Sequence, residues 1–151
     1  MSQITVRRAT KKDGKNLLAL INALAEFEKL TKPNRAAQQR LLHDGFGTRR
    51  RFDTLLGLFG GKIVGYAIMF ETYSSFRALP TLYLEDIFVL PKFRGRGIGE
   101  SLFTRCIMEA RKRKCGRMEW IVLDWNKNAI RFYRRLHAKR MKEWLLYRLE
   151  F

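Results

Sequence analysis

The stretch Arg94-Gly95-Arg96-Gly97-Ile98-Gly99 decides how this chain is interpreted. An apolar segment, residues 82–90, precedes it and is typical of a buried strand. A helical pattern follows it, with apolar side chains at Ile98, Leu102, Cys106 and Ala110. The glycines are therefore predicted to lie where a strand turns into a helix.

Glycines at the start of a helix are suited to binding phosphate. The first N–H groups of a helix have no partner inside it and carry partial positive charge. Glycine also lets the backbone approach a pyrophosphate without a Cβ in the way. A Rossmann site would need G-x-G-x-x-G near the start of a βαβ unit, and a Walker loop would need Gly-Lys-Ser/Thr, so neither pattern fits. A flexible turn without a ligand is the structural alternative.

At this point the chain resembles the GNAT superfamily of N-acetyltransferases. Their acetyl-CoA loop is [Q/R]-x-x-G-x-[G/A] between a central strand and a long helix, and Arg94, Gly97 and Gly99 match it. A second element of the family follows, because a strand ending in Trp125-Asn126 leads into a helix with Ala129, Phe132 and Tyr133. The ordered set is more specific than the loop alone.

Within that superfamily, three segments look like the spermidine/spermine (diamine) and thialysine acetyltransferases. Residues 83–89 read Tyr-Leu-Glu-Asp-Ile-Phe-Val, residues 42–47 Leu-His-Asp-Gly-Phe-Gly, and residues 132–135 Phe-Tyr-Arg-Arg. The resemblance extends from Arg7 to about Trp144 and so covers most of the chain. It implies an α/β GNAT fold, with a mixed, mostly antiparallel sheet, a splayed central strand pair and helices on both faces.

Apolar periodicity and turn signals predict the element order βααβββαβαββ. The predicted helices span residues 11–30, 35–43, 97–114 and 126–136. The predicted strands span residues 3–8, 52–59, 62–71, 81–90 and 118–124, with two short strands or a hairpin at 139–150. Gly60-Gly61 is a hairpin signal, and residues 72–80 are predicted to form a loop closed by Pro80.

Length and composition favour one acetyltransferase domain over residues 1–151, since 46% of the residues are hydrophobic and suffice for a core. No apolar run approaches the roughly 20 residues of a membrane span, and the start lacks the apolar region of a signal peptide. Cys106 and Cys115 form neither a disulfide framework nor a zinc-ligand spacing. We therefore expect a cytoplasmic protein without a metal.

The formal net charge of +17 is unevenly distributed. Residues 1–50 carry a net charge of +7, residues 51–100 of +1, and residues 101–151 of +9. A basic surface favours polyanions such as the CoA phosphates, nucleic acid or anionic surfaces. The alternative is a solvated cationic surface that serves no particular partner.

The resemblance implies acetyl-CoA as co-substrate. Residues 95–99 would offer backbone N–H groups to the pyrophosphate, and the strand before them would pair with the pantetheine amides if it splays from its neighbour. Glu100 opens the helix, and its side chain is expected to point outward because a carboxylate repels phosphate. The residues expected at acetyl-CoA are Ile87, Phe88, Val89, Arg94, Gly95, Arg96, Gly97, Ile98, Gly99, Glu100, Asn126 and Ala129.

Two residues are expected to carry the chemistry. Tyr133 lies on one helical stripe with Asn126 and Ile130, and a phenol with a pKa of about 10 can donate a proton to a departing thiolate. Its alternative role is that of a packing tyrosine. Glu85 matches the glutamate that serves the family as a base through water. An ordinary glutamate is a weak base, so holding a cationic substrate is its other use.

Further residues fall where the resemblance implies acceptor contacts: Phe27, Glu28, Asp86, Glu119 and Glu143. Strict alternation along a strand would put Glu85 and Asp86 on opposite faces, so only a bulge would bring both to one site. A salt bridge is the alternative for Asp86, and a solvated strand position for Glu119. Carboxylates at these positions in a chain with 14 acidic residues favour a cationic acceptor.

One position departs from the family pattern. His137 stands where relatives usually carry the glycine of a left-handed helix end, a conformation that histidine tolerates less well. We expect His137 to be structural rather than catalytic, and nothing supports His43 as a ligand or base.

Three functions stay open from the sequence. The first is acetylation of a small primary amine, such as a polyamine, a diamine or a thialysine-like amino acid. The second is acetylation of a protein or peptide. The third is a basic nucleic-acid-associated module on the same scaffold, although no nucleic-acid-binding motif is present and any such binding is expected to be weak and non-specific. We also expect a homodimer and no membrane association.

Overall fold

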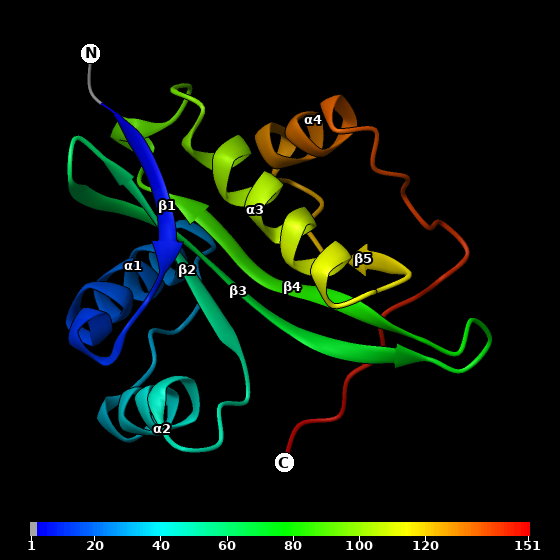
Figure 1. Cartoon of the computed structure of the whole chain (residues 1–151), viewed down its shortest axis with the longest axis horizontal. Coiled ribbons are helices and arrows are strands. Elements are labelled where there is room, and N and C mark those ends of the chain that lie inside the picture. Colours follow the sequence, from blue (N-terminus) through cyan, green and yellow to red (C-terminus); the bar gives the residue numbers. More distant parts are fainter. Residues whose placement is uncertain (1–2) are drawn as a thin grey trace. The chain divides into compact units, whose positions relative to one another are not determined.

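The centre of the fold is a five-stranded sheet (Figure 1). Its strands lie in the order in which they follow one another in the chain, and only the last pair is parallel. The strands are β1 (Ile4–Arg8), β2 (Asp53–Phe59), β3 (Lys62–Ser74), β4 (Leu79–Val89) and β5 (Arg117–Glu119). The predicted mixed, mostly antiparallel sheet is confirmed.

The structure, a computed structural model, describes residues 3–151. Two compact units divide the chain, the first ending at Trp120 and the second running from Ile121 to Phe151. The sheet and most helices belong to the first unit, while α4 (Lys127–Arg135) belongs to the second. The single domain over residues 1–151 stays a prediction.

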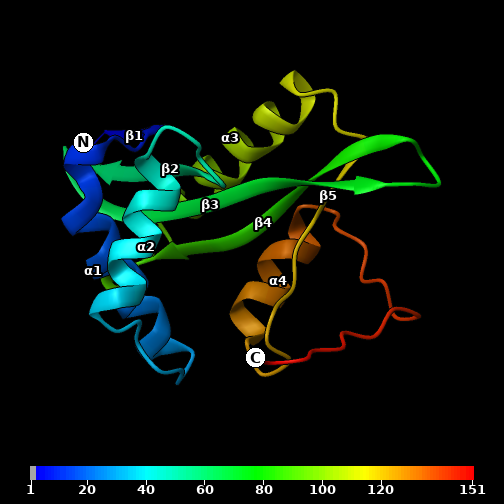
Figure 2. The same ribbon diagram turned by 90° about the horizontal axis from the view of Figure 1, so that it is seen from below.

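Three α-helices of the first unit cover the two faces of the sheet (Figure 2). The helices α1 (Gly14–Phe27) and α2 (Arg35–Phe46) lie on one face, and α3 (Ile98–Lys112) lies on the other. Single 3-10 turns precede α1 at Lys11–Asp13 and α3 at Pro91–Phe93. The predicted coverage of both faces is therefore confirmed.

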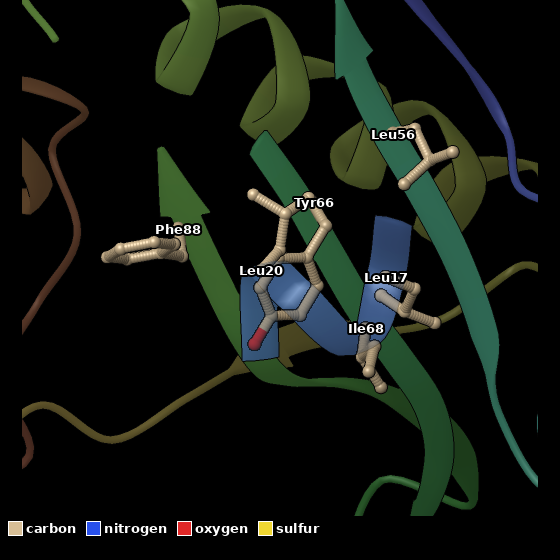
Figure 3. Packing of buried hydrophobic residues seen from close by; sticks show 6 residues of the cluster. All are labelled: Leu17, Leu20, Leu56, Tyr66, Ile68 and Phe88. Carbon is tan, nitrogen blue, oxygen red and sulfur yellow. The ribbon is translucent and has the colours of Figure 1, made fainter. Parts of the chain in front are cut away.

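Apolar side chains of α1 and three strands form the core beneath one face of the sheet (Figure 3). The labelled members of this cluster are Leu17, Leu20, Leu56, Tyr66, Ile68 and Phe88. On the opposite face α3 approaches the sheet closely, because a Cβ at Gly57 would lie only 2.9 Å from the Cγ2 of Ile98. Glycine at this position lets the first turn of α3 pack directly on β2.

The connection between β3 and β4 is shorter than predicted. The strands pair as far as Ser74 and Leu79, so the expected loop over residues 72–80 is wrong. Pro80 is accommodated within this hairpin, opposite Tyr73, and its carbonyl accepts the N–H of Gly116. A proline lacks only the backbone N–H that donates to a neighbouring strand, so it fits near the end of a strand, where the loss of one such hydrogen bond is tolerated.

The C-terminal prediction also needs correction. The expected strand at 118–124 is reduced to β5, and the described residues 139–150 contain no strand. Residues 147–151 alternate in the way a strand does, yet the large apolar side chains of segment 144–151 are all at least 69% exposed. A strand needs a hydrogen-bonded neighbour, which apolar alternation alone does not supply.

Candidate active site

The glycine loop joins β4 to α3, as the sequence predicts. Gly95 and Gly97 have φ values of +73° and +87°, in the left-handed region that favours glycine. Gly97 is the residue before the first turn of α3, and its carbonyl accepts hydrogen bonds from the N–H and hydroxyl of Ser101. The sharp turn into the helix therefore depends on these two glycines.

The start of α3 offers backbone donors. No side chain caps this helix among the described residues, so its first N–H groups have no intrahelical partner. The side chain of Ile98 is buried in the core, whereas that of Glu100 is exposed, as expected. At Gly99 a Cβ would meet only the Cγ2 of Val89, at 3.9 Å, so packing within the protein does not require glycine there.

Arg94 contacts the protein rather than extending freely from the loop. Its Nε donates a hydrogen bond of 2.8 Å to the carbonyl of Val89. Its guanidinium lies 4.6 Å from the ring centre of Phe27 and 5.3 Å from that of Phe88. The other loop arginine, Arg96, lies 5.1 Å from the ring of Phe59 and is exposed.

The strand pair β4–β5 diverges. Their recorded pairing covers only Thr81 to Tyr83 of β4, and ends opposite Glu119. Residues 87–89 pair with β3 on one side, and no strand of the described first unit borders them on the other. The splay of the central strand pair, which sequence reasoning could require but not show, is thus present.

A bulge in β4 brings two carboxylates to one region. Ile68 pairs with Asp86 and Met69 pairs with Leu84, so Glu85 is the extra residue between them. Strict alternation is broken at this point, as a shared site would need. Burial raises the pKa of the Tyr66 phenol, and the charges of both carboxylates add to that rise, so both lie close enough to influence the same hydroxyl.

Asp86 is held by that phenol. The hydroxyl of Tyr66 donates to Oδ2 of Asp86 at 3.0 Å. Burial is the main cause that raises the pKa of Asp86 to about 6; the charges of Glu85 and Glu28 contribute to this rise, and the hydrogen bond from Tyr66 opposes it. Sequence reasoning missed Tyr66; the signal was a polar hydroxyl within an apolar strand, which needs a partner when buried.

Residues at the end of α1 join this region. Glu28 follows the last residue of the helix and is half-buried, and that burial raises its pKa. The ring of Phe27 lies 6.2 Å from that of Phe88. Two expected acceptor residues, one at the end of α1 and one directly after it, are therefore brought together with the acidic pair of β4.

Glu119 lies at the edge of this region. It pairs in register with Tyr83, and its charge adds to that of Glu85 in raising the pKa of this tyrosine, whose burial is the main cause. Its carboxylate also forms an exposed salt bridge of 3.2 Å with Nε of Arg117. Glu119 is therefore in part a solvent-exposed residue of its strand, which was the alternative interpretation.

The remaining predicted residues belong to the second unit and are described within it. The side chain of Asn126 accepts the N–H of Ala129 at 3.2 Å and so caps α4. Tyr133 is half-buried, with its ring 5.6 Å from that of Phe132. Glu143 is exposed.

His137 ends α4 in a left-handed conformation, with a φ of +59°. Its N–H donates to the carbonyl of Arg134, and the next N–H, of Ala138, donates to that of Tyr133. This is the geometry in which glycine is usual. His137 therefore has a structural use at the end of α4, and that it takes no part in the chemistry stays a prediction.

Residues 3–151 contain no group of three or more His, Cys, Asp or Glu side chains arranged to hold a metal ion. None of the helices in that part of the chain has the length and apolar character needed to cross a membrane.

Comparison with known protein families supports the interpretation of the glycine loop. The model of the acetyltransferase (GNAT) family matches residues 17–138. The chain belongs to the GNAT family. It is therefore an N-acetyltransferase, and GNAT acetyltransferases use acetyl-CoA.

Individual relatives of this GNAT protein carry related activities. A thialysine N-epsilon-acetyltransferase of Mus musculus is 34% identical over 161 residues, which cover 99% of this chain and 94% of the relative. A spermidine/spermine N(1)-acetyltransferase-like protein 1 of Homo sapiens is 32% identical over 140 residues, covering 88% of this chain and 20% of the relative. The solved structure of an aminoglycoside N-acetyltransferase in complex with CoA has a TM-score of 0.78 at 20% identity, covering 100% of this chain and 97% of that one. The GNAT fold predicted from the sequence is thereby confirmed.

Proposed function

We propose that this GNAT enzyme acetylates the primary amine of a small cationic acceptor, such as a polyamine, a diamine or a thialysine-like amino acid. The observation that carries the proposal is the group of Glu28, Glu85 and Asp86. Among the described residues, none of these three carboxylates forms a salt bridge, although the chain has 31 Lys and Arg residues. Neighbouring carboxylates without a cation repel one another, which raises the free energy of the folded protein. A bound cationic substrate would reduce this repulsion.

The names of the relatives support the same class of acceptor. Thialysine and spermidine carry primary amines that are positively charged at neutral pH. A protein with a net charge of +17 repels such molecules at long range, so capture depends on local negative charge. Glu119 and Glu143 are further candidates for contacts with the acceptor.

The proposed reaction is direct transfer. Glu85 takes a proton from the ammonium through water, and the free amine attacks the thioester carbonyl. The C–N bond forms as the C–S bond breaks, and Tyr133 donates its proton to the departing thiolate of CoA. The attacking nitrogen then loses its second proton, which restores the Tyr133 hydroxyl, and Glu85 returns its proton to water. The products are the acetylated amine and CoA, with no oxidant, reductant or metal required.

For acetyl-CoA we propose the backbone of residues 95–99 as the pyrophosphate cradle and that of residues 87–89 as the partner of the pantetheine. The uncapped start of α3 and the edge of β4 that no strand of the first unit borders support both assignments. Asn126 and Ala129 are proposed near the same co-substrate because they match the family pattern, although their own hydrogen bond already has a local use.

A CoA-release assay tests the acceptor. The panel contains spermidine, a diamine, thialysine, lysine and short peptides with a free N-terminus, at equal concentrations. We expect the small amines to turn over at least tenfold faster than the peptides. Faster turnover of the peptides would favour the second function, acetylation of a protein or peptide.

Glu85→Gln tests the base, because it removes the charge and keeps the size. We expect a higher KM for the amine, a lower kcat, and a rate that rises toward higher pH, where more free amine is present. A pH–rate profile equal to that of the wild type would remove Glu85 from the site.

The third function, a nucleic-acid-associated module, is supported by the net charge alone. Any such binding should be independent of sequence and steeply dependent on salt. A sequence-selective complex that survives high salt in a gel-shift series would reverse this ranking.

We further propose a cytoplasmic homodimer. The exposed apolar side chains of segment 144–151 support self-association, because large exposed apolar surfaces are typical of interfaces. Multi-angle light scattering should give twice the 17.9 kDa mass of the chain. A monomer mass at all concentrations would contradict the dimer.

A further inference from the structure

Tyr66 and Asp86 form a polar contact at the edge of an apolar core. Tyr66 is fully buried on β3 between Leu17 and Leu20 of α1 and the neighbouring strands (Figure 3). Its ring belongs to the core cluster, and its hydroxyl reaches Oδ2 of Asp86 at 3.0 Å. A phenylalanine would fill the same space, so the hydroxyl needs an explanation beyond packing.

The surroundings of Asp86 make that hydroxyl important. The titratable groups that act on Asp86 are Tyr66 from β3, Glu85 from β4 and Glu28 from the end of α1, while Asp86 in turn acts on Tyr83. Both neighbouring carboxylates disfavour the charged form of Asp86. Within the described part of the chain, Tyr66 is the one recorded hydrogen-bond donor to this carboxylate.

We infer that Tyr66 is a positioning residue of the acceptor site, which holds one carboxylate oxygen of Asp86 so that the other is fixed and ionised for the ammonium group of the substrate. This inference rests on the proposed function. A hydrogen bond to a charged group is stronger than one between neutral groups and is directional. A rotationally free aspartate beside two other carboxylates would instead turn away from them or take up a proton.

The role of Tyr66 predicts a specific dependence on pH. The ammonium binds best when Asp86 is ionised, which requires a pH above its pKa of about 6. The hydrogen bond from Tyr66 lowers that pKa, so losing the hydroxyl raises it further. The acidic limb of kcat/KM for the amine then moves toward higher pH.

Tyr66→Phe is the test, because it removes one oxygen and keeps the ring in the core. We expect the KM for the amine to rise about tenfold with a smaller change in kcat, and the acidic limb to move up by about one pH unit. Affinity for CoA and far-ultraviolet circular dichroism should stay as in the wild type. Tyr83→Phe is the matched control, since its hydroxyl forms no recorded hydrogen bond with Asp86, and its acidic limb should not move.

Asp86→Asn completes a double-mutant cycle. If Tyr66 acts through Asp86, adding Tyr66→Phe to Asp86→Asn changes KM by less than about twofold. A tenfold further rise in KM in the double variant would overturn the inference, because Tyr66 would then act independently.

Carbon-detected NMR of the Asp86 carboxyl gives a readout that does not depend on turnover. Its titration should move to higher pH in Tyr66→Phe and stay in place in Tyr83→Phe. An unmoved titration in Tyr66→Phe overturns the inference even if the wild type acetylates small amines. If no amine of the panel reacts with the wild type, the proposed function fails, and the inference about acceptor binding fails with it whatever the titration shows.

Discussion

The Nε of Arg94 donates a hydrogen bond to the carbonyl oxygen of Val89, so the first residue of the glycine motif is tied to the last residue of β4 over 2.8 Å. The same guanidinium covers the ring of Phe27 at the end of α1. Arg94 therefore connects the loop, the central strand and the end of the helix that precedes Glu28. This contact gives the motif arginine a structural use alongside the phosphate role predicted from the sequence.

Substitutions of Arg94 separate these two uses. Arg94→Met keeps an apolar stem but loses the hydrogen bond and the stacking, and we expect CoA affinity to fall about tenfold because the loop loses its anchor. Arg94→Lys should resemble Arg94→Met, since lysine keeps the charge without the planar group. Calorimetry at low and high salt provides the measurement.

The salt series distinguishes a structural arginine from a phosphate ligand. If Arg94 acts through the structure of the loop, Arg94→Met should lose CoA affinity with salt as steeply as the wild type, because no phosphate contact has then been removed. Arg96→Met, in the exposed loop position, is the control that should flatten this dependence if Arg96 faces phosphate. Wild-type affinity in Arg94→Lys would show instead that the charge alone matters.

Gly99 gives a direct test of the cradle. Its surroundings leave room for a Cβ, so Gly99→Val should fold with a melting temperature within a few degrees of the wild type. A branched side chain would nevertheless stand where phosphate must approach, and the Kd for CoA should rise more than tenfold. Ala36→Val, at an exposed position of α2, is the control for CoA binding. If Gly99→Val binds CoA as tightly as the wild type, the pyrophosphate does not bind at this loop.

Tyr133→Phe tests the proposed acid. The ring stays in place against Phe132, while the proton for the thiolate is lost. We expect kcat to fall roughly 100-fold with CoA affinity nearly unchanged. Single-turnover kinetics with the best amine should show the loss in the chemical step, and an unchanged kcat would return Tyr133 to a packing role.

Local patterns in the sequence predicted most of the fold. The strand, turn and helix around Gly97 followed from apolar spacing and from the glycines, and the Gly60-Gly61 hairpin from turn chemistry. The hairpin at Ser74 and Leu79 was missed because Pro80 signals a break, although a proline fits near a strand end. The two short strands or hairpin expected at residues 139–150 are absent, because an apolar pattern predicts a strand but not the hydrogen-bonded partner that a strand needs.

The candidate site was predictable only in part. The carboxylates of Glu85 and Asp86 could be singled out as residue types, but the bulge that unites them depends on the register of β3 against β4. Tyr66 offered a signal as a hydroxyl within an apolar strand, but its partner could not be identified, because Asp86 lies 20 positions away in the chain. Long-range register is a property of tertiary packing, which no local period encodes.

Asp13 should make stability depend on acid. Both guanidinium nitrogens of Arg7 donate to its carboxylate, at 2.8 and 2.9 Å, and hold its pKa well below the usual range. A carboxylate whose pKa is lowered by folding stabilises the folded state at pH values above its pKa in the unfolded chain, which is about 3.9 for aspartate. This stabilisation is lost progressively as the pH falls below that value. Asp13→Asn should therefore lower the free energy of unfolding by about 2 kcal/mol at pH 7, allowing for the partial exposure of Arg7.

Urea unfolding between pH 7 and pH 2 measures this effect. The gap between the wild type and Asp13→Asn should narrow as Asp13 takes up a proton. Glu26→Gln is the control, because the salt bridge of Glu26 with Lys32 is exposed and its removal should change little. A gap that stays constant to pH 2 would mean that the ion pair contributes nothing beyond packing.

His137 should be replaceable with a gain in stability. Its φ of +59° places a side chain in the left-handed region, which costs a non-glycine residue about 1–2 kcal/mol. Glycine removes that strain but adds freedom to the unfolded chain, so His137→Gly should raise the free energy of unfolding by about 0.5–1 kcal/mol. Arg134→Gly, inside α4, is the control and should destabilise by about 1 kcal/mol relative to Arg134→Ala. Turnover of His137→Gly should equal that of the wild type, because the hydrogen bonds at this helix end involve only the backbone. A large loss of kcat in a stable His137→Gly variant would contradict the structural assignment and make the imidazole part of the chemistry.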